Sequence, residues 1–131
     1  MLIDAARRAR CPLVIGTAGT CGAGSAVDWL LGITRGILAE TGQHARIATL
    51  RCDRDPAEVA ARWASVTALP GAPDVGPDDV AACTNLVALA GAEQVQAALD
   101  TGADIVICGR TTDTAILAAL PLGRGCDAGA A

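Results

Sequence analysis

Three glycine-containing segments carry the side chains of this sequence that could bind or process a ligand. The first runs from position 16 to position 25 and has glycines at 16, 19, 22 and 24. Glycines let a backbone turn tightly and approach a bound molecule, and the N-terminus of a following helix offers free N–H groups to an anion. The predicted ligand-binding residues here are Gly16, Gly19, Gly22, Gly24 and Ser25. A tight strand-to-helix turn without a ligand is the alternative interpretation.

The second segment contains Gly109, Arg110, Thr111 and Asp113. A guanidinium group binds a carboxylate or phosphate through paired hydrogen bonds, so Arg110 is predicted to bind an anion together with Gly109 and Thr111. Asp113 is the candidate catalytic residue, as a general base or as the partner of a hydroxyl group. The structural alternatives are that Arg110 pairs with Asp113 or Asp104, and that Asp113 only caps a helix.

The third segment contains Gly91 and Glu93, which we also place among the candidate ligand-binding residues. The alternative for Glu93 is a favourable interaction with a helix dipole. No metal site is predicted, because the sequence lacks closely spaced cysteine and histidine ligands. The cofactor, if there is one, cannot be identified from these residues.

The composition excludes several kinds of chemistry. All ten basic residues of the 131 are arginine, so there is no lysine for a Schiff base or for a complete phosphate-binding P-loop. A formal net charge of −4 argues against binding to nucleic acid. No apolar run is long enough to cross a membrane, so no membrane partner is expected.

The six cysteines lack the spacing of a disulfide framework, and no export segment precedes them. We therefore expect a reducing, cytoplasmic location and cysteines that are mostly buried as small apolar side chains. Cys108 is predicted to be buried in a strand, and Cys21, in the first glycine segment, to be the more reactive thiol.

Apolar runs alternate with segments of helical period along the chain. The runs predict four parallel strands near residues 12–18, 45–52, 84–90 and 103–108. Residues 2–10 have the pattern of a helix end. An apolar stripe from Val27 to Leu38 predicts a helix that ends at Gly42, and residues 93–101 predict another.

Local signals predict where the helices begin and end. Ser25 with Asp28 resembles a capping box, and Asp55 followed by Pro56 is a strong helix start. Residues 77–82 predict a helical turn within the one long connection. A short helix over residues 114–120 is expected to begin at Asp113 and to stop at Pro121.

These elements predict an α/β fold with a doubly wound, Rossmann-like or flavodoxin-like parallel sheet of about four strands. We expect residues 1–122 to form one partial α/β domain and the Gly/Ala-rich residues 123–131 to be a disordered tail. Because ligands bind such sheets at the carboxyl ends of the strands, the three glycine-containing segments are predicted to share one edge.

Residues 102–114, GADIVICGRTTDT, together with PLVIGTAGTCGAGSAVDWL near the N-terminus, resemble the acyclic terpene utilisation family. The resemblance covers most of residues 2–125. It implies a bacterial protein associated with the breakdown of acyclic terpenes and related branched acyl compounds. It carries Gly16, Gly19, Gly109, Arg110 and Asp113 over as site-forming positions. Family chains are several times longer, so we expect this chain to be a fragment.

Three functions stay open at this point. The chain could be part of an enzyme that handles an anionic branched acyl or acyl-CoA metabolite. It could instead be a non-catalytic nucleotide- or anion-binding module, or a truncated assembly element without activity of its own. The expected partners are an anionic small molecule, and either a second copy of the chain or the remainder of a longer one.

Overall fold

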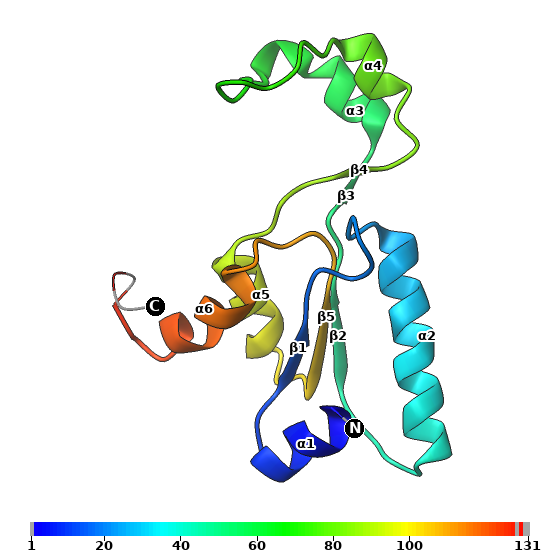
Figure 1. The fold of residues 1–131 in the computed structure, drawn as a ribbon, viewed down its shortest axis with the longest axis vertical. Helices are drawn as coiled ribbons and strands as arrows, with labels where there is room; N and C mark the ends of the chain where they lie inside the picture. The colour runs from blue at the N-terminus through cyan, green and yellow to red at the C-terminus, as the bar shows by residue number, and fades with distance from the viewer. Residues whose placement is uncertain (1, 128, 130–131) are drawn as a thin grey trace.

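The computed structural model describes residues 2–127 and 129 and has the predicted α/β architecture (Figure 1). Its helices are α1 (Leu2–Ala9), α2 (Gly24–Glu40), α3 (Pro56–Ala61), α4 (Pro77–Ala81), α5 (Ala92–Asp100) and α6 (Ala115–Gly123), with the short 3₁₀ helix η1 (Trp63–Ser65). Its strands are β1 (Leu13–Ile15), β2 (Ile47–Leu50), β3 (Asp53–Arg54), β4 (Leu86–Val87) and β5 (Ile105–Cys108).

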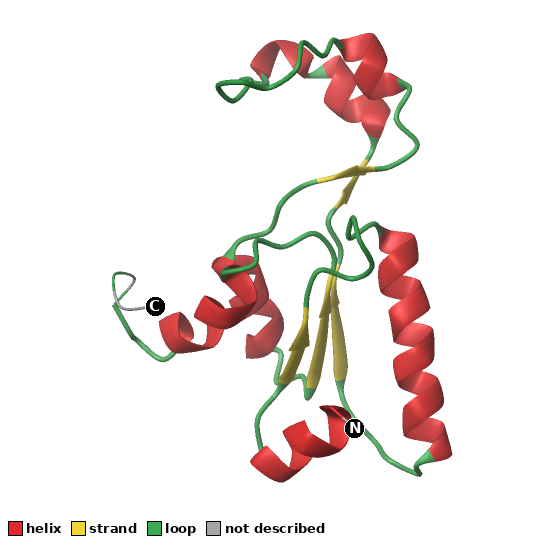
Figure 2. Cartoon of the chain, viewed as in Figure 1, coloured by secondary structure: helices red, strands yellow, loops and turns green. Residues whose placement is uncertain are grey.

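A three-stranded parallel sheet in the order β1-β5-β2 forms the centre of the molecule. Leu13 and Ile47 both align with Ile105, on either side of the central strand. Helix α2 lies on one face of the sheet, and α5 and α6 lie on the other (Figure 2). The structure thus confirms the α/β class, with a sheet that corresponds to an incomplete doubly wound fold.

The two faces of β5 build two separate cores, because successive side chains in a strand point to opposite faces. Ile105 and Ile107 pack with Val27 and Leu38 of α2. Val106 and Cys108, both fully buried, pack with the residues Val95, Ala103, Ala115 and Ala119. Because β5 is buried on both faces, its sequence has to be a continuous apolar run.

The predicted strand over residues 84–90 is corrected by the structure. Only Leu86 and Val87 form a strand, and β4 pairs antiparallel with β3 in a separate two-stranded sheet. The chain leaves the body through β3 and returns through β4. The returning strand therefore pairs with β3 and not with a strand of the main sheet. It reaches the body at Ala88, whose N–H donates to the Cys52 carbonyl at 2.7 Å, and at Ala90, in a parallel bridge to Thr111.

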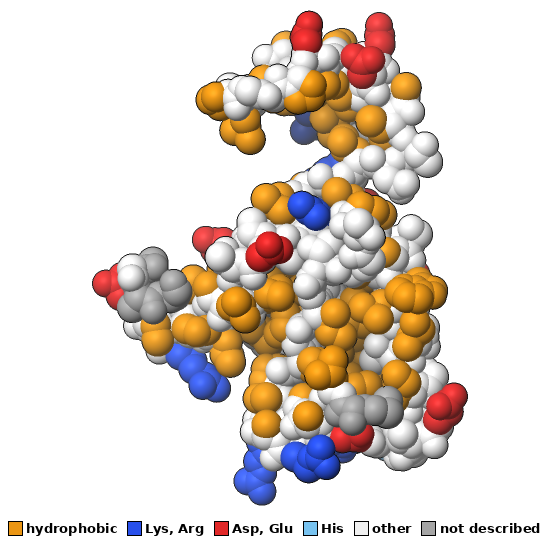
Figure 3. Space-filling view, in the orientation of Figure 1, with side chains coloured by type: hydrophobic (Ala, Val, Ile, Leu, Met, Phe, Trp, Pro, Cys, Tyr) orange, Lys and Arg blue, Asp and Glu red, His pale blue; other side chains and the backbone are white. Residues whose placement is uncertain are grey.

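Residues 55–85, carried on the β3–β4 pair, form an arm that stands away from the body (Figures 1 and 3). Helices α3 and α4 pack against each other. Neither α3 nor η1 has a buried residue, and Val80 is the buried residue of α4. The helix start at Asp55 is confirmed, since its side chain accepts a hydrogen bond of 2.8 Å from the Ala57 N–H and Pro56 occupies the first helical position.

Two predicted helix caps are wrong. Ala23, not Ser25, is the N-cap residue of α2 and has no side-chain cap. At α6 the Thr112 hydroxyl accepts a hydrogen bond of 3.1 Å from the Ala115 N–H, the role expected of Asp113. The N-cap residue of α6 is Thr114, which makes no side-chain cap, so the Thr112 contact is a local alternative to the expected one; at α2 the carboxylate that replaces a cap comes from Asp53, 29 residues away.

Two other helix ends differ in outcome. Pro121 lies inside α6, which continues to Gly123 rather than stopping. The carbonyl that Pro121 leaves without a helical donor is that of Leu117, a residue 76% exposed, so water can reach this side of the helix. The end of α2 is as predicted: Gly42, with a φ of +63°, follows the C-cap residue Thr41.

Part of the predicted tail at 123–131 belongs to α6, which includes Gly123. Residues 128 and 130–131 of that predicted tail lie outside the described residues. None of the helices in the described part of the chain has the length and apolar character needed to cross a membrane.

The six cysteines are free thiols, but only Cys52 and Cys108 are buried. The expectation that most are buried is therefore wrong. Cys11, Cys21, Cys83 and Cys126 are exposed because they occupy loops and helix ends rather than the sheet.

Candidate functional site

The loop after β1 and the loop after β5 are bound together at the carboxyl edge of the sheet. The Thr17 hydroxyl donates to the Thr111 carbonyl and accepts from the Thr111 N–H, each at 3.2 Å. The Ala18 N–H donates to the Cys108 carbonyl at 2.9 Å. The first and second glycine-containing segments therefore meet at one edge, as the sequence predicts.

Glycines allow the two loops to touch through their backbones. A Cβ atom on Gly22 would lie 2.3 Å from the Arg110 nitrogen, and one on Gly109 would lie 2.8 Å from the Gly22 carbonyl oxygen. A Cβ on Gly16 would lie 2.7 Å from Thr111 Oγ1. Real side chains do not tolerate such distances, so these three glycines have a structural role in joining the loops.

The first turn of α2 is held by a carboxylate from within the chain. Asp53 Oδ1 accepts a hydrogen bond of 2.7 Å from the Gly24 N–H. A Cβ on Gly24 would lie 2.7 Å from Asp53 Oδ2, so the glycine makes room for this carboxylate. Asp53 thus occupies part of the helix N-terminus that the sequence offered to an external anion.

Arg110 and Asp113 are both exposed on the loop after β5. Within residues 2–127 and 129, neither side chain has a hydrogen bond or an ion pair. The Asp104 carboxylate instead accepts from the Arg46 N–H at 2.7 Å. The structural alternatives for Arg110, a pair with Asp113 or Asp104, are therefore not made.

The third segment joins the same edge through Ala90. Its N–H donates to the Arg110 carbonyl at 2.9 Å, and its carbonyl accepts from the Thr112 N–H at 3.2 Å. The next residue, Gly91, donates its N–H to Gln94 Oε1 at 2.8 Å, while Glu93 is exposed in the first turn of α5.

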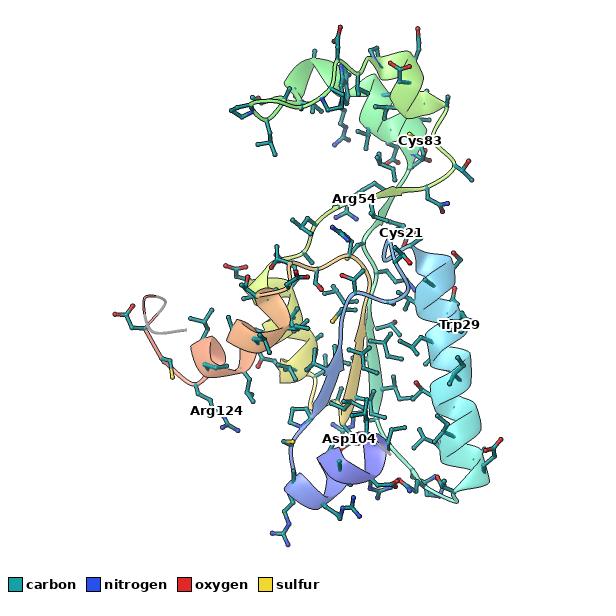
Figure 4. All side chains as sticks on the ribbon, in the orientation of Figure 1. Cys21, Trp29, Arg54, Cys83, Asp104 and Arg124 are labelled. Carbon is teal, nitrogen blue, oxygen red and sulfur yellow. The ribbon has the colours of Figure 1, made fainter. Side chains whose placement is uncertain are left out.

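Two candidate residues of the first segment are exposed: Gly19 in the loop and Ser25 in the first turn of α2. Gly19 has a φ of +60°, a conformation that suits glycine. Cys21 lies on the same loop, at the end of the body from which the β3–β4 pair and Arg54 extend toward the arm (Figure 4).

Sequence reasoning missed four residues that build this edge: Thr17, Cys52, Asp53 and Ala90. The Cys52 thiol donates to the Arg110 carbonyl at 3.3 Å, and burial raises its pKa. Burial also raises the pKa of Cys108, to about 11. Neither buried thiol is therefore ionised near neutral pH. The available signal was that Cys52 ends the strand predicted at 45–52 and Asp53 directly follows it, which places both at the same sheet edge as Arg110.

A family model described as acyclic terpene utilisation family protein AtuA matches residues 3–122. No curated protein and no solved structure matches the chain. Across the described residues, no group of three or more histidine, cysteine or acidic side chains is placed to hold a metal ion.

Proposed function

Because the chain belongs to the acyclic terpene utilisation family, we propose that it binds an anionic branched acyl or acyl-CoA metabolite at the carboxyl edge of its sheet. The anionic group of the ligand lies against the Arg110 guanidinium, the loop residue Gly19 and Ser25 in the first turn of α2. The chain acts in the cytoplasm, which agrees with its four exposed free thiols.

The observation that carries this proposal is that Arg110 has a fixed backbone and an exposed, unpaired side chain among the described residues. Its carbonyl is fixed by Ala90 and Cys52, and its backbone packs on Gly22, yet its side chain is exposed and has no partner among the described residues. A rigid backbone holding an unpaired guanidinium group is well suited to receive a carboxylate or phosphate, at about 1.5–3 kcal/mol for each charge-assisted hydrogen bond.

The role of the first glycine-containing segment follows from which of its residues stay exposed. Asp53 accepts the Gly24 N–H, so the ligand contacts the residues that stay exposed, Gly19 in the loop and Ser25 in the first turn of α2. Gly16, Gly22 and Gly109 keep the two loops in contact and support the site from behind. Gly91, Glu93 and Asp113 border it, with Asp113 as the candidate for proton transfer or hydroxyl binding, whereas Thr111 is buried against Thr17 and only supports the loop.

Titration calorimetry of the chain with isovaleryl-CoA, coenzyme A and isovalerate tests this proposal. We expect Arg110→Ala to weaken binding about tenfold or more, which corresponds to about 1.4 kcal/mol. Arg124→Ala is the matched control, because it removes the same exposed charge at the C-terminal end of α6. Thermal melting of Arg110→Ala should equal that of the parent chain, since the side chain makes no contact that supports the fold.

The three ligands separate the alternatives. Binding of coenzyme A alone, with no gain from the acyl group, favours a non-catalytic nucleotide-binding module. No binding of any of the three by the parent chain refutes the proposed site and favours an assembly element. Assembly with a second copy or with further protein stays a prediction, to which exposed apolar residues such as Leu2, Trp29 and Leu69 give support.

A further inference from the structure

The opposite, amino-terminal edge of the sheet contains a cavity of about 530 Å³. Helix α1, the start of β1 and the turns before β2 and β5 surround it, at the end of the body where Asp104 lies (Figure 4). Its volume falls in the range of about 300–1,000 Å³ that is usual for small-molecule sites. It is separate from the carboxyl-edge site, which involves none of its lining residues.

The cavity has an apolar floor and a charged rim. Ile3, Leu13, Leu99 and Ile105 contribute to the floor. The charged and polar lining residues are Arg7, Arg10, His44 and Asp104. Basic side chains gather at this end of the molecule (Figure 3). A ligand with an aliphatic part and a single negative charge matches this division.

Arg10 has an unusual backbone for an arginine. Its φ is +51°, and it is the one non-glycine residue with a positive φ in the described part of the chain. Its N–H donates to the Arg7 carbonyl and the Cys11 N–H donates to the Ala6 carbonyl, both at 3.1 Å, which is a Schellman end for α1. Glycine is the usual residue at this position, because L side chains are strained there. Arg10 occupies this strained position on the rim of the cavity, where its charge is available to a ligand.

Arg7 is held in place while Arg10 is not. Arg7 Nη1 donates to Gln43 Oε1 at 2.9 Å, and Gln43 Nε2 donates to Asp4 Oδ1 at 2.8 Å. The Arg10 side chain is exposed and has no hydrogen bond or ion pair with any described residue. One positioned and one unpaired guanidinium group therefore stand at the rim.

Asp104 is the carboxylate that lines this cavity, and its negative charge would repel a bound anion. Its Oδ2 already accepts the Arg46 N–H at 2.7 Å, which satisfies part of its hydrogen-bonding capacity within the protein. Two arginines against one such carboxylate leave the rim with an excess of positive charge. His44, exposed on the same rim, adds a further donor.

We propose that this cavity is a second binding site, which takes a short aliphatic monocarboxylate. The carboxylate binds Arg10 with the support of Arg7, and the aliphatic chain lies on the floor formed by residues such as Leu13 and Leu99. This site is independent of the proposed function, because its ligand contacts neither Arg110 nor the loop after β1.

The reactivity of the chain's own cysteines can be used to detect ligand binding at both edges of the sheet. Cys11 lines the cavity and is exposed, Cys21 lies on the loop beside Arg110, and Cys83 is exposed on the arm far from both. The native chain is alkylated with iodoacetamide with and without octanoate, and the rate at each cysteine is measured by mass spectrometry. We expect octanoate to slow the modification of Cys11 and to leave Cys83 unchanged. Slower modification of Cys21 alone would support only the carboxyl-edge site and would overturn this second one.

Acetate and octylamine test the two parts of the ligand. Acetate keeps the charge and lacks the chain, whereas octylamine keeps the chain and reverses the charge, so neither should protect Cys11 at concentrations at which octanoate does. Equal protection by octylamine would mean that Asp104 or the apolar floor governs binding, and would refute the proposal.

Arg10→Gly separates binding from folding. The substitution removes the guanidinium group and introduces the residue that the positive φ favours, so thermal melting should stay the same or rise while the octanoate needed for protection increases about tenfold. Arg124→Ala again serves as the control for loss of one exposed arginine. Unchanged protection in Arg10→Gly overturns the assignment.

Discussion

Gly22→Ala should destabilise the protein far more than an equivalent change elsewhere, because it separates the two loops of the carboxyl edge. Gly22 has a φ of +74°, and an added Cβ would lie 2.3 Å from the Arg110 nitrogen and 2.6 Å from its Cα. The backbone of a fixed loop must move to admit it. Gly42→Ala is the matched control, because Gly42 has a φ of +63° and open space around its Cα.

Both substitutions force alanine into a left-handed backbone conformation, but only Gly22→Ala also creates a steric clash. Forcing alanine into the left-handed conformation costs about 1–2 kcal/mol, partly offset by about 0.5–1 kcal/mol from the stiffer unfolded chain. Gly42→Ala should therefore lower the free energy of unfolding by about 1 kcal/mol. Overpacking adds about 1–3 kcal/mol at Gly22, which gives a total of about 2–4 kcal/mol.

Urea unfolding followed by circular dichroism measures both values, and thermal melting checks them. At about 4 °C for each kcal/mol, Gly22→Ala should melt about 10 °C below the parent chain and Gly42→Ala about 4 °C below it. Equal losses in the two variants would mean that the loops do not touch at Gly22. The argument that these glycines join the loops would then be wrong.

Three further outcomes can be measured on the same protein. Gly36→Ala, in the middle of α2 with nothing within 4 Å of the added Cβ, should raise the free energy of unfolding by about 0.5–1 kcal/mol in urea denaturation. Thiol labelling at pH 8 should modify Cys21 readily and Cys108 last, since Cys108 is fully buried with a pKa of about 11; faster labelling of Cys108 would contradict its place in the core. Thermolysin should cut first within residues 64–75, all of them exposed, and a first cut inside β5 would show that the arm is more protected than its exposure implies.

The elements that the sequence predicted well are those whose pattern reflects their own burial. The run from Ile105 to Cys108 is apolar because β5 is covered on both faces, and the stripe from Val27 to Leu38 follows the single face that α2 presents to the sheet. The meeting of the first and second glycine-containing segments at one edge followed from the parallel direction of β1 and β5 alone. Such features need no knowledge of a particular distant partner.

The errors arose where a distant contact decides the local structure. Residues 84–90 are as apolar as a strand, but β4 pairs with β3 because the arm brings these segments together. Ser25 has the residue type of a cap, yet Asp53 accepts the hydrogen bond at α2. Proline usually ends a helix, but α6 continues past Pro121. The unpaired state of Arg110 was likewise not visible in the sequence, because it depends on where Asp104 and Asp113 lie.

The position of β5 in the sheet has a consequence for how the protein folds. The central strand, at residues 105–108, comes after both of the strands that it joins, β1 at residues 13–15 and β2 at residues 47–50. Every ladder of the main sheet therefore has to close a long loop, and contacts so distant in sequence slow the folding of a small domain. During synthesis, β1 and β2 have no partner in this sheet until residue 108 has left the ribosome. The apolar side chains of both strands are exposed to other unfolded chains for that whole interval.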